Sequence, residues 1–129
     1  MTEFTLPAQQ ACSAQVFGLA NIGPKDIDTL QVYDSFSLHI PLALEGNGYC
    51  AVGDAGKFLR EQGVGPGGRL PTNTSGGHLS EAYMQGWNHQ IECVRQLRGE
   101  SGTRQVPNCR FAHYSSAVAG KAVSIIYSR

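Results

Sequence analysis

The spacing of apolar residues changes twice in the first third of the chain. Between residues 7 and 20, apolar side chains recur at intervals of three and four, which predicts a helix. These are Cys12, Val16 and Leu19. Gly23-Pro24 breaks the pattern, and residues 27–33 then alternate in the manner of a short strand.

A second helix is predicted from Phe36 to Leu44, where Ile40 completes the helical spacing. Pro41 lies within it, so this helix either bends there or begins anew. From Gly46 to Gly77 glycine and proline dominate, and only Asp54–Gln62 could form a short helix. Because a long irregular segment in a compact domain usually serves a site, we expect one here.

The best-defined periodic segment follows these glycines. Apolar residues recur at intervals of three and four until Gly99, and basic residues occupy the last turn, as is typical of a helix C-terminus. They are Leu79, Tyr83, Trp87, Ile91, Val94 and Leu97, with Arg95 and Arg98. Two strands are predicted at 105–114 and 121–127. This order of helices and strands predicts a single α/β domain over residues 1–129.

Composition narrows the possible functions. The chain is 41% hydrophobic and 16% charged, which is typical of a globular protein. Ten basic residues balance ten acidic ones without a basic cluster, so nucleic acid is not an expected partner. No apolar run approaches the roughly 20 residues of a membrane span, and the start lacks a signal-peptide pattern. We therefore expect a cytoplasmic protein. Neither a disulfide framework nor a metal site is predicted by the spacing of Cys12, Cys50, Cys93 and Cys109.

Residues 73–77, Asn-Thr-Ser-Gly-Gly, form the strongest candidate for chemistry, and we call them the glycine corner. Glycines allow a ligand to approach the backbone, and a helix that follows offers free amide donors, so such a corner can bind an oxyanion. A tight turn that requires only positive φ is the alternative explanation. For a bare glycine pair the turn is the more common case, so the surrounding motifs must decide.

Four segments match motifs of one family in the same order along the chain. They are Asn21–Asp28, Tyr33-Asp34-Ser35-Phe36-Ser37, Arg69–Gly77 and Val94–Glu100. The first resembles the helix-to-strand link of the thiolase superfamily, and the second resembles its Asn-Glu-x-Phe-Ala element. The third resembles the approach to the family's histidine, and the fourth is similar to its lipid-transfer or sterol-carrier-type branch. The resemblance covers essentially the whole chain and implies a thiolase-like C-terminal domain, an α/β fold with a mixed sheet packed with helices.

The resemblance also implies that the catalytic positions are altered. Tyr83 stands where the histidine of the family's Gly-His-Pro motif follows the paired glycines, and no Gly-His-Pro exists in the chain. Tyr33 stands where the family has the asparagine that helps to polarise the thioester carbonyl. The C-terminal cysteine and its glycine cluster are missing near Tyr114–Ser116. Thiolytic Claisen chemistry is therefore expected to be disabled.

Two tyrosines can divide the roles of acid and base if their surroundings bring one phenol into working range. Related aldolases of the family use such a pair for retro-aldol cleavage of β-hydroxyacyl-CoA thioesters from sterol side chains. The resemblance thus implies that Tyr33 and Tyr83 are catalytic. The alternatives are a core contact for Tyr83, on the apolar stripe of its helix, and simple packing at a strand end for Tyr33.

Further residues are expected to contact substrate around this pair. They are Asn73, Gly76, Gly77, His78 and His113. His39 and His89 are expected on helix surfaces instead. No cofactor is expected to be bound, and coenzyme A enters only as part of the acyl-CoA substrate.

The thiolase fold pairs two similar halves, and the resemblance implies that the N-terminal half is absent from this chain. The chain is then a fragment, a split subunit or a truncated gene product. Our first hypothesis is the C-terminal half of an aldolase. A thiolase-like acyl-CoA acyltransferase and a noncatalytic subunit that completes another thiolase-like chain stay open. The implied partners are the N-terminal half, further subunits in a homo- or hetero-oligomer, and a small protein with an OB-fold and a zinc ribbon.

Overall fold

A mixed sheet of three strands forms the centre of the protein. The computed structural model describes the backbone of residues 2–129 and the side chains of residues 6–129. Strand β1 (Thr29–Val32) pairs in parallel with β2 (Phe111–Val118), and β2 pairs antiparallel with β3 (Lys121–Ser128). The predicted α/β class with a mixed sheet is therefore confirmed.

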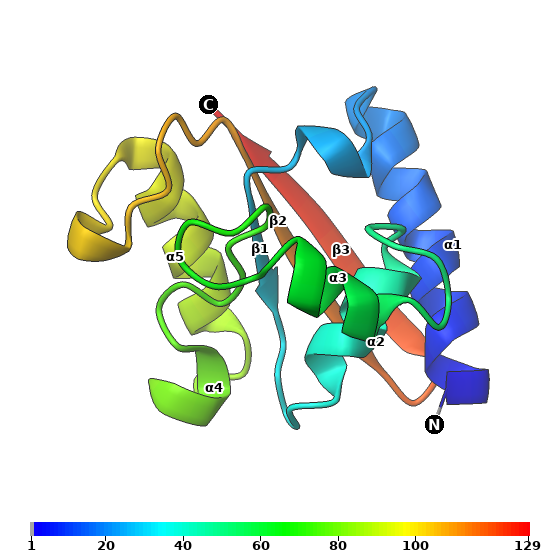
Figure 1. Ribbon diagram of the computed structural model, residues 1–129. Coiled ribbons are helices and arrows are strands. Elements are labelled where there is room, and N and C mark those ends of the chain that lie inside the picture. Colours follow the sequence, from blue (N-terminus) through cyan, green and yellow to red (C-terminus); the bar gives the residue numbers. More distant parts are fainter. Residues whose placement is uncertain (1) are drawn as a thin grey trace.

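Helices cover both faces of this sheet, as Figure 1 shows. On one face lie α1 (Thr2–Ala20) and α2 (His39–Gly46), with α3 (Ala55–Glu61) beyond α2. On the other face lie α5 (Trp87–Arg98) and the single turn α4 (Gly77–Ser80). No helix in residues 2–129 has both the length and the apolar character that a bilayer span requires.

Each face of the sheet has its own hydrophobic core. The larger cluster lies under α1 and α2 and consists of Phe17, Ile27, Leu30, Val32, Ala43, Leu44, Ala55 and Leu70. The smaller cluster lies under α5 and consists of Cys93, Leu97, Cys109, Ala112 and Tyr114. Successive strand residues point to opposite faces, so β1 contributes Leu30 and Val32 to the larger cluster, and β2 contributes Ala112 and Tyr114 to the smaller one.

Several predicted elements exist with shifted bounds. Helix α1 begins at Thr2 rather than at residue 7, and α2 begins at His39 because Phe36 lies in the exposed turn before it. Strand β2 begins at Phe111 rather than at residue 105. The 3₁₀ turns η1 (Pro24–Asp26) and η2 (Gly102–Arg104) occupy connections for which no element was predicted.

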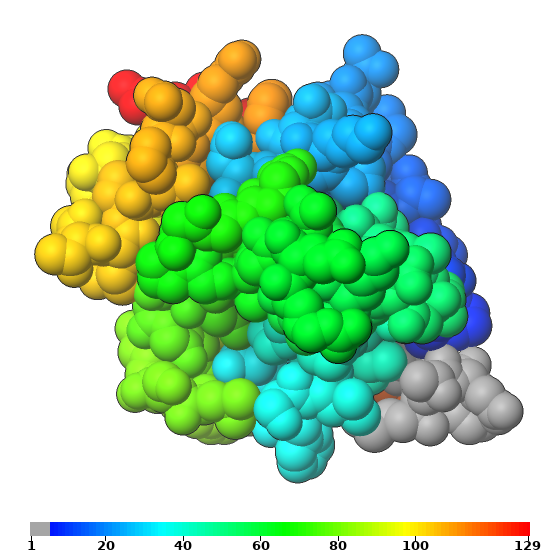
Figure 2. Space-filling view, in the orientation of Figure 1, coloured from blue at the N-terminus to red at the C-terminus, as the bar shows by residue number. Residues whose placement is uncertain are grey.

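The glycine-rich segment 46–77 runs across the middle of the molecular surface, between the blue α1 and the yellow α5 region in Figure 2. Its end adds a short extension to the free edge of β1. The N–H of Leu30 donates to the Pro71 carbonyl at 3.1 Å, and the N–H of Asn73 donates to the Leu30 carbonyl at 3.0 Å. These bonds fix the glycine corner beside the end of β1.

The prediction of one continuous helix from Leu79 to Leu97 is wrong. Residues 81–86 separate α4 from α5 and are not helical. Gln85 has φ +52° and Gly86 has φ +87°, values that the right-handed helix does not allow. The spacing of three and four simply continues across the break, so periodicity alone could not reveal it.

Helix α5 buries a mixed face, with Cys93 and Leu97 in the smaller core and four polar residues beside them, rather than the apolar face that amphipathicity predicts. Its polar residues Asn88, His89, Glu92 and Gln96 are buried against the sheet. The apolar stripe is exposed instead: Leu79 is 56%, Tyr83 69%, Trp87 63% and Ile91 43% accessible. We refer to these four residues as the apolar stripe. It faces away from the core of this domain.

Candidate active site

The carboxylate of Asp34 anchors the glycine corner to the end of β1. Its Oδ1 accepts the His78 N–H at 2.9 Å, and its Oδ2 accepts the Leu79 N–H at 3.3 Å. Gly77 has φ +60°, and a Cβ there would lie 2.5 Å from Asp34 Oδ2 and 2.8 Å from Asn73 Nδ2. Asp34 thus satisfies the first amides of α4, rather than those of a helix near Phe36.

The side chain of Asn73 serves as a pairing partner for β1. Its Oδ1 accepts the Val32 N–H at 2.7 Å, and its Nδ2 donates to the Val32 carbonyl at 3.0 Å. The backbone of Asn73 is left-handed, with φ +49°, a conformation that asparagine tolerates better than most residues. Both ends of the amide are occupied within the protein, so a substrate could reach it only by displacing these bonds.

Four rings gather where β1 meets the glycine corner, and we call Tyr33, His78, Tyr83 and His89 the ring cluster. His78 is central. Its ring centroid lies 4.4 Å from that of Tyr33, 5.2 Å from that of Tyr83 and 4.6 Å from that of His89, each in an edge-to-face arrangement. The structure therefore brings the two predicted catalytic tyrosines together around His78. Gly76, with φ +104°, leads the chain into this position.

The two phenols differ in their surroundings. Tyr83 is 69% exposed, whereas Tyr33 is half-buried beneath it. Hydrogen bonding with the Tyr83 phenol, burial, and the neighbouring Tyr83 and Tyr114 groups raise the pKa of Tyr33 to about 12. Tyr33 therefore keeps its proton at neutral pH and suits a hydrogen-bond donor.

The predictions for His39 and His89 are wrong, because neither residue lies on a helix surface. His89 is fully buried, and its Nε2 lies 2.8 Å from Asp34 Oδ1. Burial lowers the pKa of His89, although the bond to Asp34 opposes this shift. His39 is also buried, with Nδ1 3.0 Å from the Tyr33 carbonyl oxygen. The missed signal was the polar stripe that includes His89, which recurs along α5 at helical spacing.

The prediction that His113 lines the same pocket is wrong as well. His113 points to the α1 face of the sheet, whereas its neighbour Tyr114 points to the α5 face. Its Nδ1 lies 2.7 Å from the Tyr49 hydroxyl, and its Nε2 lies 2.6 Å from Ser124 Oγ. His113 is a fully buried structural residue, and both of its nitrogens are occupied within the protein.

The buried His113 is expected to make the protein sensitive to acid. Burial lowers its pKa to about 3, so below about pH 6.5 the unfolded chain binds a proton that the folded protein does not. The free energy of unfolding should therefore fall by about 1.4 kcal/mol per pH unit between pH 6 and 4 from this group alone. In urea unfolding, His113→Gln should remove this part of the slope. Tyr49→Phe, which deletes only the partner hydroxyl, should keep it, and equal slopes in all three proteins would refute the assignment.

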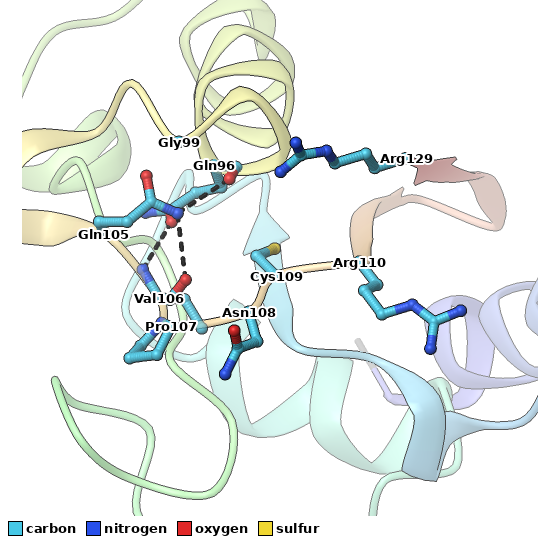
Figure 3. A pocket seen from close by; sticks show the side chains of 9 residues that line it. All are labelled: Gln96, Gly99, Gln105, Val106, Pro107, Asn108, Cys109, Arg110 and Arg129. Atoms are coloured by element: carbon cyan, nitrogen blue, oxygen red, sulfur yellow. Dashed lines mark hydrogen bonds between the residues drawn. The ribbon is translucent and has the colours of Figure 1, made fainter.

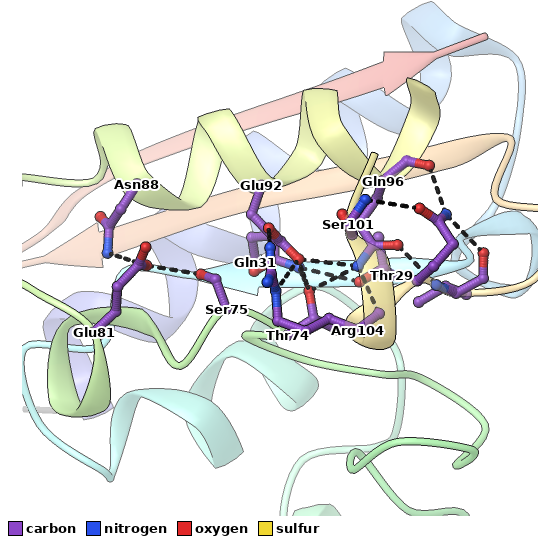
Figure 4. Close-up of polar contacts among 12 residues, drawn as sticks. Thr29, Gln31, Thr74, Ser75, Glu81, Asn88, Glu92, Gln96, Ser101 and Arg104 are labelled. Atoms are coloured by element: carbon purple, nitrogen blue, oxygen red, sulfur yellow. Dashed lines mark hydrogen bonds and ion pairs between the residues drawn. The ribbon is translucent and has the colours of Figure 1, made fainter. Parts of the chain in front are cut away.

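A buried polar network joins the glycine corner to α5, as Figure 4 shows. Glu92 is its centre: Oε1 accepts bonds from the Thr74 hydroxyl at 2.8 Å and from Gln96 Nε2 at 3.0 Å, and Oε2 accepts one from Arg104 Nη2 at 3.0 Å. Gln31 on β1 donates to the same Thr74 hydroxyl at 2.9 Å. Burial favours the neutral acid, but the bonds from Arg104, Thr74 and Gln96 together lower the pKa of Glu92. The network holds the glycine corner against β1 and α5, and no pattern in the sequence predicted it.

Removing Arg104 from this network is expected to destabilise the fold. Arg104→Gln leaves a buried carboxylate without its cation, so the free energy of unfolding should fall by about 2 kcal/mol at pH 7. The loss should be complete above about pH 4.5 and should shrink as the pH falls through the lower pKa that Glu92 has in the folded protein. Urea unfolding at pH 7 and at a pH below about 4.5 measures this loss of stability. Arg95→Gln, an exposed change on α5, is the control, and a loss of equal size there would refute the assignment.

Several open depressions lie elsewhere on the surface, and two of them are lined in part by residues of the polar network. One of about 520 Å³, shown in Figure 3, is lined by Gln96, Gly99, Gln105, Val106, Pro107, Asn108, Cys109, Arg110 and Arg129. The other, of about 510 Å³, reaches Asn73 and Thr74 from the side of the glycine-rich segment. Neither is lined by the two tyrosines. Within the described side chains, no three His, Cys, Asp or Glu residues are grouped to hold a metal ion.

Comparison with known proteins gives close relatives. A 17-hydroxy-3-oxo-4-pregnene-20-carboxyl-CoA lyase of Mycobacterium tuberculosis is 41% identical over 96 residues, which are 74% of this chain and 25% of the lyase. A steroid side-chain-cleaving aldolase of Thermomonospora curvata is 38% identical over 96 residues, with the same shares. The solved structure of an Ltp2-ChsH2(DUF35) aldolase matches with a TM-score of 0.86 and 34% identity, over 95% of this chain and 32% of that chain.

The chain thus spans about a quarter to a third of the length of these relatives. Over its own length the family match is complete, because the thiolase C-terminal domain-like family matches residues 1–129. The fold and the order of motifs agree with this match. The chain belongs to the thiolase C-terminal domain-like family.

Proposed function

We propose that this chain is the part of a thiolase-fold aldolase that carries the catalytic tyrosines and that it cleaves a C–C bond in a β-hydroxyacyl-CoA. The observation that carries the proposal is the meeting of Tyr33 and Tyr83 around His78, at positions where the resemblance places the thiolase asparagine and histidine. The names of the relatives, a lyase and an aldolase, support the same reaction class.

The two phenols divide the steps of a retro-aldol reaction. Tyr83, the more exposed of the two, acts as the base in its phenolate form and takes the proton of the β-hydroxyl group. The C–O bond becomes a carbonyl, the bond between Cα and Cβ breaks, and its electron pair forms a thioester enolate. Tyr33 stays protonated because its pKa is raised, and it donates a hydrogen bond to the enolate oxygen. Tyr83 returns the proton to Cα, which yields a ketone and a shortened acyl-CoA.

The substrate follows from the relatives. The name of one includes a pregnene carboxyl-CoA, and that of another includes a steroid side chain. We therefore infer a bulky, sterol-like acyl chain linked to coenzyme A for this chain. Coenzyme A enters as part of the substrate, with no separate cofactor in the reaction.

The exposed apolar stripe supports a partner chain. Leu79, Tyr83, Trp87 and Ile91 are all exposed, and exposed apolar surface of this extent is typical of an interface. We infer that the N-terminal half of a thiolase fold covers part of the apolar stripe and leaves the Tyr83 hydroxyl open to substrate. The double name of the solved aldolase supports a further partner, for which a small OB-fold and zinc-ribbon protein stays our prediction. A cytoplasmic location likewise stays a prediction.

Product analysis tests the proposed reaction. The protein, combined with its N-terminal half, is incubated with a β-hydroxyacyl-CoA that carries ¹³C at Cα, and the products are identified by mass spectrometry. We expect one ketone for each shortened acyl-CoA, with the label in the acyl-CoA. Release of free acid without C–C cleavage, or transfer of the intact acyl group to a protein cysteine, would instead support the acyltransferase hypothesis.

A further inference from the structure

We propose that Asp34, His89 and His78 form one hydrogen-bonded relay, in which Nδ1 of His78 donates to Nδ1 of His89. This relay fixes the orientation of the two tyrosines, Tyr33 and Tyr83. This relay deepens the proposed function and rests on it. It makes His89 a positioning residue, although His89 itself does not contact the reacting atoms.

The backbone fixes the tautomer of His78. The N–H of Gly86 donates to His78 Nε2 at 3.1 Å, so Nε2 must be the unprotonated nitrogen. In a neutral ring the proton then lies on Nδ1. This N–H is buried and has no hydrogen-bond partner among the residues that the structure describes. His78 therefore presents a buried donor in need of an acceptor.

Asp34 fixes the tautomer of His89 in the complementary way. An ionised carboxylate only accepts hydrogen bonds, so His89 Nε2, at 2.8 Å from Asp34 Oδ1, carries the proton. In a neutral ring Nδ1 is then a bare acceptor. It too is buried and has no partner within the described part of the chain, and His89 is 0% exposed.

The unpaired donor and the unpaired acceptor belong to neighbouring rings. The centroids of His78 and His89 are 4.6 Å apart, with an angle of 81° between the ring planes. A buried polar atom without a partner is unfavourable, so a rotation that joins the two Nδ1 atoms is favoured. The result is a continuous chain of bonds from Gly86 through both histidines to Asp34.

This chain of bonds controls the orientation of the tyrosines. The ring of His78 contacts both Tyr33 and Tyr83, and the ring of His89 stacks on Tyr33 with centroids 6.2 Å apart. Asp34 also holds the backbone N–H of His78. Fixing the His78 ring therefore fixes the surfaces against which both phenols pack.

The relay requires a neutral His89, because a second proton would place one N–H opposite another. Burial lowers the pKa of His89 and so favours the neutral ring. The titratable groups that face it are Asp34 after β1, Tyr33 at the end of β1, His78 on α4, Glu81 after α4, and Tyr114 on β2. Asp34 and Glu81 oppose the effect of burial, and His78 adds to it.

Nuclear magnetic resonance tests the relay without any need for turnover. Two-bond ¹H–¹⁵N spectra of the ¹⁵N-histidine-labelled protein at neutral pH should show His78 protonated at Nδ1 and His89 protonated at Nε2. An Nε2-protonated His78, or a His89 protonated at Nδ1, would overturn the relay. Because this measurement reads only the tautomers, it separates failure of the relay from failure of the proposed reaction.

A pair of variants then tests the positioning role. His89→Phe keeps an aromatic ring but removes both nitrogens, and we expect kcat to fall about 10²-fold with KM changed less than about twofold, since a misplaced catalytic group costs about that factor. The same spectra should show that the Nδ1 proton of His78 has lost its acceptor. His113→Phe, a matched change on the opposite face of the sheet, should leave kcat unchanged. An unchanged kcat in His89→Phe would overturn the positioning role.

Discussion

Tyr83→Phe is expected to lower kcat for cleavage of a β-hydroxyacyl-CoA by about 10²–10⁴-fold, the usual contribution of a general base. Tyr33→Phe should have an effect in the same range, because it removes the donor for the developing enolate oxygen. Both changes keep the aromatic ring, so the contacts with His78 persist and KM should change little. Steady-state kinetics of the protein combined with its N-terminal half measures both variants.

A tyrosine outside the ring cluster provides the control. The Tyr127 hydroxyl donates to Gln90 Oε1 at 2.8 Å, and Tyr127→Phe should leave kcat unchanged. If the double variant Tyr33→Phe/Tyr83→Phe retained wild-type turnover, the two phenols would be packing residues only. The noncatalytic-subunit hypothesis would then be the correct one.

Gly86→Ala is expected to have a large effect on the structure of the site. Gly86 has φ +87°, and a Cβ there would meet the Tyr114 hydroxyl and lie 3.1 Å from Tyr33 Cδ2. The backbone strain and the overpacking together should lower the free energy of unfolding by about 3 kcal/mol. The added methyl group should also displace Tyr33, so kcat should fall in the protein that remains folded.

Gly99→Ala separates strain from overpacking. Gly99 also has positive φ, +73°, but a Cβ there would meet no atom within 4 Å. This variant should lose only about 1 kcal/mol of stability, from the left-handed backbone, and should keep full activity. Urea unfolding of both variants measures the difference, and equal losses would show that the space beside Tyr33 is not tight.

The sequence predicted the fold class and the region of the site for physical reasons. Apolar spacing in the first half reports the large core only in part: Leu30 and Leu44 are buried there, but Leu19 of the first predicted helix is 81% exposed and Phe17, outside the predicted face, is buried instead. The glycine corner and the two tyrosines were found through motifs, and the structure brings these segments together as the resemblance implied. Apolar spacing and motifs are both read from short stretches of the sequence, so neither depends on contacts between distant residues.

The second half was harder to predict, because only part of its apolar pattern, such as Leu97, lies in the core of this domain. The apolar stripe suggested one buried helix, yet Trp87 and Ile91 are exposed and the polar side of α5 faces the sheet. If a further half of the fold covers the stripe, as proposed, the apolar periodicity of the stripe results from that contact. The sequence pattern of a single chain does not distinguish burial within its own domain from burial against a partner.

The errors with histidines have a similar origin. His113 was placed by its closeness in sequence to Tyr114, but adjacent strand residues point to opposite faces. His89 was placed on a surface because histidine is polar, but the carboxylate of Asp34 makes a buried histidine favourable there. Both placements depend on strand register and on contacts between residues distant in the sequence.

The dependence of cleavage on free coenzyme A distinguishes retro-aldol cleavage from thiolysis. A thiolytic reaction consumes free coenzyme A, whereas retro-aldol cleavage does not. In rapid-quench experiments with the protein and its N-terminal half, we expect ketone and shortened acyl-CoA to appear in equal amounts. Their rate of formation should be the same with and without added coenzyme A. Cleavage that occurs only when coenzyme A is added, together with an acyl group trapped on the protein, would contradict retro-aldol cleavage.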